Sequence, residues 1–267
     1  MNRPNLDLNI QVTGIGTPFI WAHGLLMSMA VEDQIDWFEW SSFPKNIQLI
    51  RYDARGHGAS RSSLRAQDYH WDQLGRDMLS VASLTHHEQF IAAGDSMGCA
   101  TALYAAIQAP ERIKALLLVI PPTAWQSRIT QKRLYRGLAV AGGLLGGSRL
   151  SSLTSSNMER MLPPWLVTAE KEKLHALSEG LATRSRLTLW NLMRGVAVSD
   201  LPTREQLTAL KDIPIAIIGW TDDRSHPTAT AETLHAWLPQ SSLYIARNYQ
   251  DFKTIPKRMQ DFIARFT

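Results

Sequence analysis

The stretch AAGDSMGCA, from Ala92 to Ala100, contains the pattern Gly-x-Ser-x-Gly between two segments of different type. The residues that lead into it, QFIAAGD, are typical of a buried strand, and those that follow, MGCATALYAAIQ, are typical of a helix. A strand that turns directly into a helix would hold Ser96 at a tight turn with its hydroxyl exposed above a sheet. Gly94 and Gly98 would let the strand and the helix approach closely. The stretch therefore predicts an α/β fold with Ser96 as a nucleophile.

Five other short apolar runs indicate further strands of the same sheet. They lie at Pro18–His23, Ile47–Asp53, Ile113–Pro121, Ile213–Trp220 and Ser241–Arg247. In the first half of the chain such runs alternate with amphipathic segments, which is typical of a mostly parallel sheet covered by helices. Between residues 123 and 209 helical patterns replace the strand signal. We therefore expect a core domain made of residues 1–122 and 210–267, interrupted by an inserted helical cap, or lid, at residues 123–209.

Two further motifs accompany the serine pattern. WAHGLLMS (Trp21–Ser28) is similar to the His-Gly oxyanion loop of the α/β-hydrolase superfamily, and YDARGHGAS (Tyr52–Ser60) is similar to that family's D-x-R-G-H-G-x-S turn. The three motifs follow one another in the order found in the family. The chain thus resembles an α/β hydrolase, and the resemblance implies a mostly parallel central sheet flanked by helices, with a helical cap and a serine nucleophile.

The resemblance also assigns the oxyanion-hole donors. They are the backbone N–H groups of Leu25, directly after His23 and Gly24, and of Met97, directly after the nucleophile. Such donors must point at the oxygen that becomes negative when a hydroxyl attacks a carbonyl group. The alternative is that His23 and Gly24 only form a tight turn. His57, in the second motif, is expected to be structural.

A serine hydroxyl is a weak nucleophile until a base accepts its proton, and that base is normally a histidine oriented by a carboxylate. In the family the carboxylate follows the strand after the cap, where this chain reads IIGWTDDRSHP (Ile217–Pro227). The usual G-x-x-D spacing selects Asp222 over Asp223. The alternative is that one or both aspartates only stabilise the turn.

The family's histidine is expected in the loop after the last strand, as the second residue of a Gly-His pair followed further on by a proline. Counting back from Pro256 puts Asn248 in the glycine position and Tyr249 in the histidine position. Two adjacent positions therefore depart from the family pattern. Tyr249 could still act as a weak acid or as a hydrogen-bond donor in the same pocket.

Another histidine would then have to act as the base. His226, four residues beyond Asp222 on the same loop, is the best substitute, although it needs an unusual turn to reach both Asp222 and Ser96. His175 lies in the expected cap and would have to approach from above.

The composition narrows the class of protein. The chain has 267 residues, of which 45% are hydrophobic and 19% charged, enough for a large buried core. The single cysteine, Cys99, excludes an intramolecular disulfide and is compatible with a reducing cytoplasm. No apolar run approaches the ~18 residues of a spanning helix, and the first residues lack the apolar core of a secretion signal. We expect a soluble cytoplasmic protein with no stable membrane insertion.

The formal charge of +4 is unevenly distributed, because residues 121–200 contain eleven Lys/Arg and five Asp/Glu. This basic excess indicates either a solvated helical surface or a region that attracts anions. The chain lacks basic runs interleaved with aromatic residues, metal-ligand clusters and phosphate-binding loops, so we expect no nucleic-acid partner, no metal and no cofactor.

Three functions fit these observations. The first is a serine hydrolase of a small or medium ester, lactone or related acyl compound, with an atypical or missing histidine base. The second is a catalytically degenerate hydrolase that binds a small ligand. The third is an enzyme that uses the same pocket for proton transfer or cyclisation.

Overall fold

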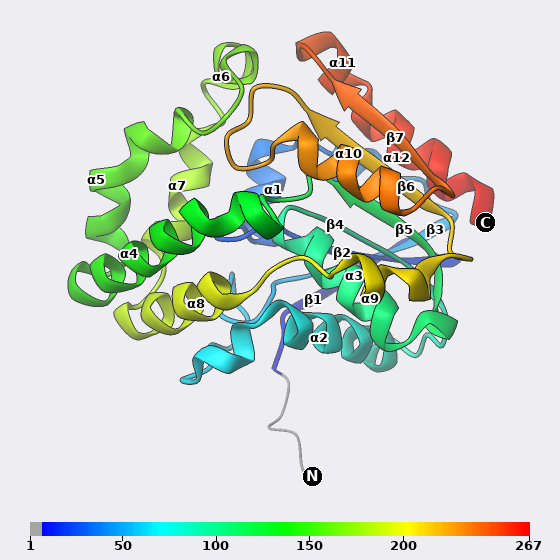
Figure 1. Cartoon of the computed structure of the whole chain (residues 1–267), viewed down its shortest axis with the longest axis horizontal. Helices are drawn as coiled ribbons and strands as arrows, with labels where there is room; N and C mark the ends of the chain where they lie inside the picture. Colours follow the sequence, from blue (N-terminus) through cyan, green and yellow to red (C-terminus); the bar gives the residue numbers. More distant parts are fainter. Residues whose placement is uncertain (1–6) are drawn as a thin grey trace.

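The computed structural model describes residues 7–267. The chain folds around a central seven-stranded sheet (Figure 1). Its strands are β1 (Ile10–Thr13), β2 (Thr17–Ala22), β3 (Ile47–Tyr52), β4 (Phe90–Asp95), β5 (Ile113–Val119), β6 (Ile215–Trp220) and β7 (Ser241–Ala246). They lie in the order β1-β3-β2-β4-β5-β6-β7, with β1 antiparallel to β3 and the other neighbouring pairs parallel. The mostly parallel sheet predicted from the sequence is confirmed.

The apolar pattern does not predict β1. This strand has only four residues, and three of them are exposed because it forms the edge of the sheet. It pairs with β3 in a register that joins Ile10 to Tyr52. A short exposed strand carries no apolar run, so its position depends on the partner strand rather than on its own residues.

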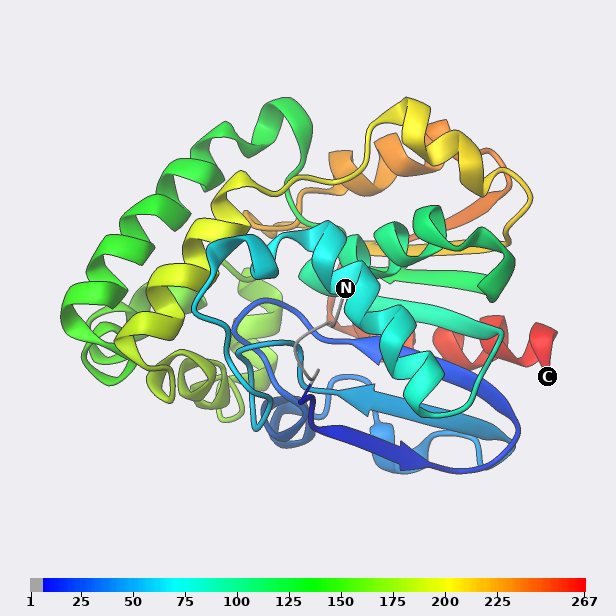
Figure 2. The ribbon, with the colours of Figure 1, turned by 90° about the horizontal axis from the view of Figure 1, so that it is seen from below.

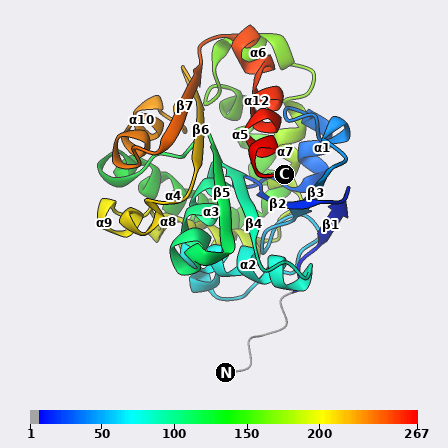
Figure 3. The ribbon, with the colours of Figure 1, turned by 90° about the vertical axis from the view of Figure 1, so that its right-hand side faces the viewer.

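Two sets of helices cover the two faces of the sheet (Figure 3). On one face lie α2 (Trp71–Leu84), α3 (Met97–Gln108) and α10 (Thr228–Trp237), and on the other lie α1 (Met29–Ile35) and α12 (Ile255–Ile263), the last preceded by α11 (Tyr249–Lys253). Successive side chains of β2 alternate between the two cores: Phe19 and Trp21 pack with α1 and α12, and Ile20 packs with α2 and α3. Both faces are therefore buried, as parallel sheets require.

Residues 123–209, which we call the inserted segment, lie between β5 and β6 and contain no strand. Its helices are α4 (Ile129–Leu145), α5 (Gly147–Glu159), α6 (Pro164–Glu170), α7 (His175–Ala182), α8 (Arg186–Val198) and α9 (Arg204–Leu207). The first five gather beside the sheet, at the left of Figures 1 and 2. Short 3-10 turns complete the described elements: η1 (Trp40–Ser42), η2 (Ala66–Tyr69), η3 (Pro110–Arg112), η4 (Trp125–Arg128), η5 (Thr208–Leu210) and η6 (Ala264–Phe266). Within residues 7–267, no helix has the length and apolarity to cross a membrane.

Arg128 ties together the two ends of the inserted segment. Its side chain is fully buried, and its guanidinium donates to the carbonyl oxygens of Thr123, Val196 and Ser199 at 2.9, 3.2 and 2.7 Å. The guanidinium also lies 4.0 Å from the ring centroid of Trp71, on α2 of the core. These contacts hold the start and the end of the segment against the sheet-covering helices.

Candidate active site

Ser96 lies at the turn between β4 and α3, as the sequence predicts. Its φ of 51° and ψ of −111° place a non-glycine residue in a strained backbone region. The turn requires two glycines, because a Cβ at Gly98 would lie 1.8 Å from the Ala22 carbonyl oxygen and one at Gly94 would lie 2.5 Å from the same atom. β2, β4 and α3 can therefore approach closely enough to present the serine at the carboxyl edge of the sheet.

His226 reaches this serine. Its Nε2 lies 2.7 Å from Ser96 Oγ, and its Nδ1 lies 2.9 Å from Asp223 Oδ2. With Nδ1–H donating to the carboxylate, Nε2 is left to accept the hydroxyl proton of Ser96. The three side chains thus form a hydroxyl, imidazole and carboxylate in series, which is the arrangement that activates a serine nucleophile.

A tight turn after β6 makes this arrangement possible. The buried Asp223 accepts, at Oδ1, the backbone N–H groups of Ser225 and His226 at 2.8 and 3.0 Å, and at Oδ2 the indole N–H of Trp220 at 2.7 Å. The carboxylate therefore closes the turn and brings the imidazole alongside itself. Burial raises the pKa of Asp223, but the neighbouring His226 and these hydrogen bonds outweigh it, and the pKa lies below the ordinary value of an aspartate.

Asp222, which the spacing selects, is not brought to this cluster. Its side chain is exposed and accepts a hydrogen bond from Thr221 Oγ1 at 3.0 Å. Its φ of 66° is a left-handed conformation that turns the chain so that the next residue points inward. The carboxylate that contacts His226 is therefore the residue after Asp222, because residue spacing does not report which side chain faces the sheet.

Tyr249, in the position expected for histidine, begins α11 and points to the inserted segment. Its hydroxyl donates to Glu170 Oε1 on α6 at 2.5 Å, and Glu170 Oε2 pairs with Lys173 at 3.1 Å. The hydrogen bond to Glu170 raises the pKa of Tyr249 above its ordinary value. His175 is exposed, and its ring contacts the carbonyl oxygen of Glu172. Neither side chain is placed beside Ser96.

The loop that contains Gly24 and Leu25, where the sequence predicts an oxyanion donor, is held by His23. This buried imidazole donates from Nδ1 to the Gly24 carbonyl at 2.8 Å and accepts at Nε2 the N–H of Ala54 at 2.9 Å. Burial lowers its pKa to about 4, so the ring is neutral. At Gly24, an added Cβ would lie 3.5 Å from Ser96 Cβ, which places this loop directly over the serine. His23 and Gly24 therefore shape the loop.

The residues of the two expected oxyanion donors, Leu25 and Met97, both lie close to Ser96. Leu25 lines the cavity around the serine, and Met97 is the first residue of α3. The first N–H groups of a helix have no partner within the helix, and they carry its positive end. The start of α3, directly after Ser96, can therefore supply an N–H donor.

A cavity of about 230 Å³ opens over Ser96 and His226. Its apolar wall includes Trp37, Ile120 and Trp220 from the core and Met161, Leu162 and Leu177 from the inserted segment. Asp95 also lines it; this carboxyl is buried, its Oδ1 has no hydrogen-bond partner among the described residues, and burial and the nearby Glu32 raise its pKa well above the ordinary value. Sequence reasoning did not identify Trp37, Trp220 or Asp95, and only the position of Asp95 next to the serine would have signalled it.

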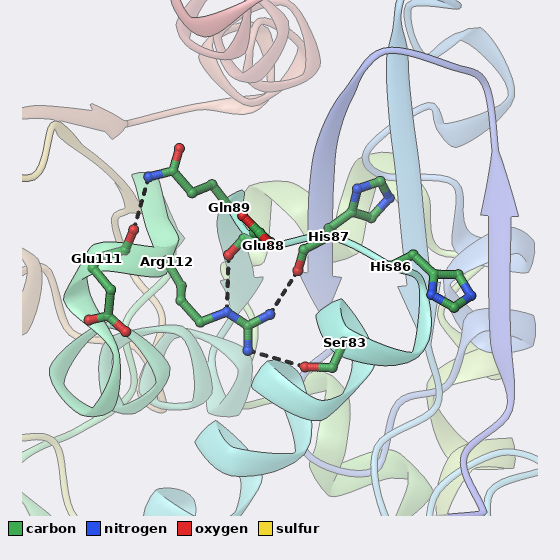
Figure 4. A pocket seen from close by; sticks show the side chains of 7 residues that line it. All are labelled: Ser83, His86, His87, Glu88, Gln89, Glu111 and Arg112. Atoms are coloured by element: carbon green, nitrogen blue, oxygen red, sulfur yellow. Dashed lines mark hydrogen bonds between the residues drawn. The ribbon is translucent and has the colours of Figure 1, made fainter.

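A larger hollow, of about 620 Å³, lies at the amino ends of β4 and β5, at the other end of these strands from Ser96 (Figure 4). It is bordered by the residues that precede β4 and β5, whereas Ser96 follows β4. Its central side chain, Arg112, donates to the carbonyl oxygens of His87 and Glu88 at 2.7 and 3.0 Å and to Ser83 Oγ at 3.2 Å. The arginine is thus engaged in joining α2 to the sheet. Within the described range, no group of three or more His, Cys, Asp or Glu side chains is placed to hold a metal ion.

Comparison with known proteins agrees with this fold. The family model described as alpha/beta hydrolase fold matches residues 17–252. 3-Oxoadipate enol-lactonase 2 of Acinetobacter baylyi is 27% identical over 214 residues, which cover 80% of this chain and 74% of that protein. A thermophilic esterase from Thermogutta terrifontis superposes with a TM-score of 0.79 at 18% identity, covering 97% of this chain and 92% of the other. The enol-lactonase from Burkholderia xenovorans gives a TM-score of 0.77 at 17% identity, over 97% and 95% of the two chains. The chain belongs to the α/β-hydrolase fold family.

Proposed function

We propose that the protein is a serine hydrolase of small or medium carboxylic esters or lactones, with Ser96 as nucleophile, His226 as general base and Asp223 as the carboxylate that orients the base. The observation that carries this proposal is the 2.7 Å contact between His226 Nε2 and Ser96 Oγ. A ligand-binding protein and a non-hydrolytic enzyme were both suggested by the lack of a base in the expected loop. Because a base is in contact with the serine, this geometry favours hydrolysis over both.

In the proposed reaction, Ser96 Oγ attacks the carbonyl carbon while its proton moves to His226 Nε2. The carboxylate of Asp223 stabilises the imidazolium through the Nδ1–H hydrogen bond. The carbonyl oxygen becomes negative and accepts hydrogen bonds from the backbone N–H groups of Leu25 and Met97. When the tetrahedral intermediate collapses, the C–O bond breaks and the imidazolium gives its proton to the leaving alcohol.

Water then hydrolyses the remaining acyl-enzyme, and His226 again acts first as a base and then as an acid. His226 removes a proton from water, the hydroxide attacks the ester carbonyl, and Ser96 leaves with the proton returned by the imidazolium. With a lactone, the leaving alcohol stays attached to the acyl group, and the product is a hydroxy acid.

We further propose that the inserted segment forms a cap over the cavity. The support is that Met161, Leu162 and Leu177 of this segment line the cavity together with core residues. A cap of apolar side chains would exclude bulk water from the oxyanion hole, where hydrogen bonds are stronger in a medium of low dielectric constant.

The substrate class rests on the cavity and on one relative. A volume of about 230 Å³ is below the range of roughly 300–1,000 Å³ that is usual for drug-sized ligands, and most of the wall is apolar. Both features favour a short acyl chain. The Acinetobacter relative is named as an enol-lactonase, which favours a lactone within this class.

The test is labelling with a fluorophosphonate probe together with hydrolysis of p-nitrophenyl acetate and butyrate. We expect labelling that disappears in Ser96→Ala. In His226→Ala, kcat should fall by roughly 10⁴-fold or more, the scale seen when a triad base is removed.

His175→Ala and Tyr249→Phe are the matched controls, because each replaces the other group that the sequence offers as a catalytic partner. Both should keep kcat within about threefold of wild type, since neither side chain contacts Ser96. Unchanged labelling and turnover in His226→Ala would refute the assignment of the base. A collapse of activity in Tyr249→Phe would restore the tyrosine as a catalytic group.

A further inference from the structure

The outward face of α4 consists of apolar side chains and arginines. Ile129, Arg133, Arg136, Val140 and Leu144 follow one another at intervals of three or four residues, so they lie on one side of the helix, and all five are exposed. The exposed fractions of the three apolar side chains are 57, 51 and 69%. The opposite side of α4 provides its buried contacts, through Gln131, Ala139 and Gly142.

The outward face of α8 has the same composition. Its exposed residues are Arg186, Leu187, Trp190, Arg194 and Val198, again on one side of the helix. Leu187 and Val198 are 51 and 56% exposed, and the guanidinium of Arg194 lies 5.1 Å from the ring centroid of Trp190. A helix whose exposed positions hold only leucine, tryptophan, valine and arginine departs from the usual pattern, in which the solvent side is charged and polar.

The two faces adjoin. α4 and α8 lie side by side in both views of the inserted segment (Figures 1 and 2). A Cβ at Gly142 would lie 2.8 Å from Leu189 Cβ, and one at Gly143 would lie 3.3 Å from the Trp190 ring. We call the outward residues of the two helices, as named above, the α4/α8 face.

The α4/α8 face is basic as well as apolar. Neither helix contains an aspartate or glutamate, and the face carries four arginines. The contacts at Gly142 and at Gly146, the latter with Arg186, indicate that α4 packs antiparallel to α8, which puts Arg136 near the level of Arg194 and Arg186 near the level of Leu144. Arginines therefore alternate with apolar side chains along this face, with no carboxylate on either helix, so the face is complementary to a surface that is both anionic and apolar. A phospholipid surface offers anionic headgroups for the arginines and an acyl boundary for the apolar side chains and the tryptophan.

We propose that the α4/α8 face binds the surface of membranes that contain anionic phospholipid. The protein would lie on the bilayer through α4 and α8, two adjacent antiparallel helices of the inserted segment, without a spanning helix. Binding to anionic lipid would also account for the excess of Lys and Arg over Asp and Glu in residues 121–200. This proposal is independent of the catalytic roles of Ser96 and His226.

The test is co-sedimentation of the full chain with vesicles of phosphatidylcholine alone or mixed with phosphatidylglycerol. We expect binding to the mixed vesicles that weakens as salt is raised, and little binding to phosphatidylcholine. Arg136→Glu with Arg194→Glu should lower the affinity for mixed vesicles at least about tenfold. Leu144→Ser with Leu187→Ser should also weaken binding, with the charge unchanged.

The control is Arg76→Glu with Lys211→Glu, which changes the net charge equally at two exposed positions outside the inserted segment. It should keep most of the vesicle binding. All the substituted side chains are exposed, and thermal unfolding will verify that each variant is folded. Lack of binding to mixed vesicles, or an equal loss in the control, overturns the proposal. A dimer in sedimentation velocity that is lost in the Leu144/Leu187 variant, with no vesicle binding, would assign the face to a second copy and also overturn it.

Discussion

Asp222 and Asp223 are adjacent in the chain, yet only one of them touches His226. Asp223 is buried and receives three further hydrogen bonds from the turn and from Trp220, whereas Asp222 faces solvent. The same carboxylate therefore shapes the loop and contacts the imidazole. Its two tasks are separable by a substitution that keeps the shape of the side chain.

Asp223→Asn should lower kcat by roughly 10³ to 10⁴-fold, because an NH2 group in the place of Oδ2 cannot accept Nδ1–H and a neutral amide does not stabilise an imidazolium as a carboxylate does. Asp222→Asn should leave kcat within about twofold of wild type. Steady-state hydrolysis of p-nitrophenyl butyrate measures both. Equal losses in the two variants would show that the loop, and not the individual carboxylate, is what matters.

Glu32 is a second buried carboxyl near the site. Its oxygens accept the Trp21 indole N–H at 2.7 Å and the Arg51 guanidinium at 3.1 Å. Burial raises its pKa from 4.5 to about 7, although Arg51 and the Trp21 hydrogen bond oppose this. Folded Glu32 thus keeps a proton that the unfolded chain has already released in this pH range.

The sign of the effect on stability follows from proton linkage. Since the folded state binds more protons between pH 4.5 and about 7, the Glu32 contribution to the free energy of unfolding falls as pH rises, by up to about 1.4 kcal/mol per pH unit. The Glu32→Gln variant has no carboxyl at this position and therefore lacks this pH-dependent contribution to the free energy of unfolding. The wild-type free energy minus that of the variant should therefore decrease from pH 5 to pH 7 and then level off, as measured by urea unfolding. His23, whose pKa is lowered, is present in both proteins and cancels. Parallel pH curves would contradict the prediction.

At the scale of the elements, Arg128 holds the ends of the inserted segment through three carbonyl oxygens, and no carboxylate among the described residues pairs with it. Arg128→Met should lower the free energy of unfolding by about 2–4 kcal/mol, because three carbonyl oxygens lose their charged donor in a buried place. The exposed Arg133→Met on the next turn is the matched control and should change stability by less than about 0.5 kcal/mol. Denaturant unfolding of the two variants tests this, and an equally small change in both would show that the buried contacts add little.

The elements near Ser96 were predictable because short-range pattern and geometry agree there. β4, Ser96 and α3 follow from an apolar run, a pair of glycines and a helical pattern, and the inserted helices follow from the loss of the strand signal. The loop after β6 was not predictable in detail. Which aspartate turns inward depends on the left-handed conformation of Asp222 and on the Trp220 hydrogen bond, and neither is encoded in residue spacing.

For the molecule as a whole, the sheet order explains how distant segments meet. β4 and β6 flank β5, so the turn that holds Ser96 and the loop that holds His226 emerge from the same edge of the sheet with one strand between them. The inserted segment leaves after β5 and returns before β6, and it contributes one wall of the cavity. The cavity is therefore bounded by the core and by the inserted helices together.

A covalent adduct in this cavity should stabilise the whole chain. Reaction of Ser96 with a small alkyl fluorophosphonate would fill space between core and inserted helices, and a gain of about 1 kcal/mol corresponds to a rise of roughly 2–4 °C in Tm for a protein of this size class. Differential scanning calorimetry before and after labelling measures the shift. Ser96→Ala treated in the same way should not shift, and a lower Tm after labelling would mean that the adduct forces the two parts apart.

The spacing of Asp223 and His226, three residues apart in one turn, has an evolutionary consequence. In the proposed relay, Asp223 and His226 lie within one short loop. Recombination or loop exchange after β6 would therefore transfer or remove both residues at once. The segment that follows β7 then has no catalytic residue to provide, so its residues can be selected for packing alone. In this chain Tyr249, which lies in that segment, donates a hydrogen bond to Glu170 on α6.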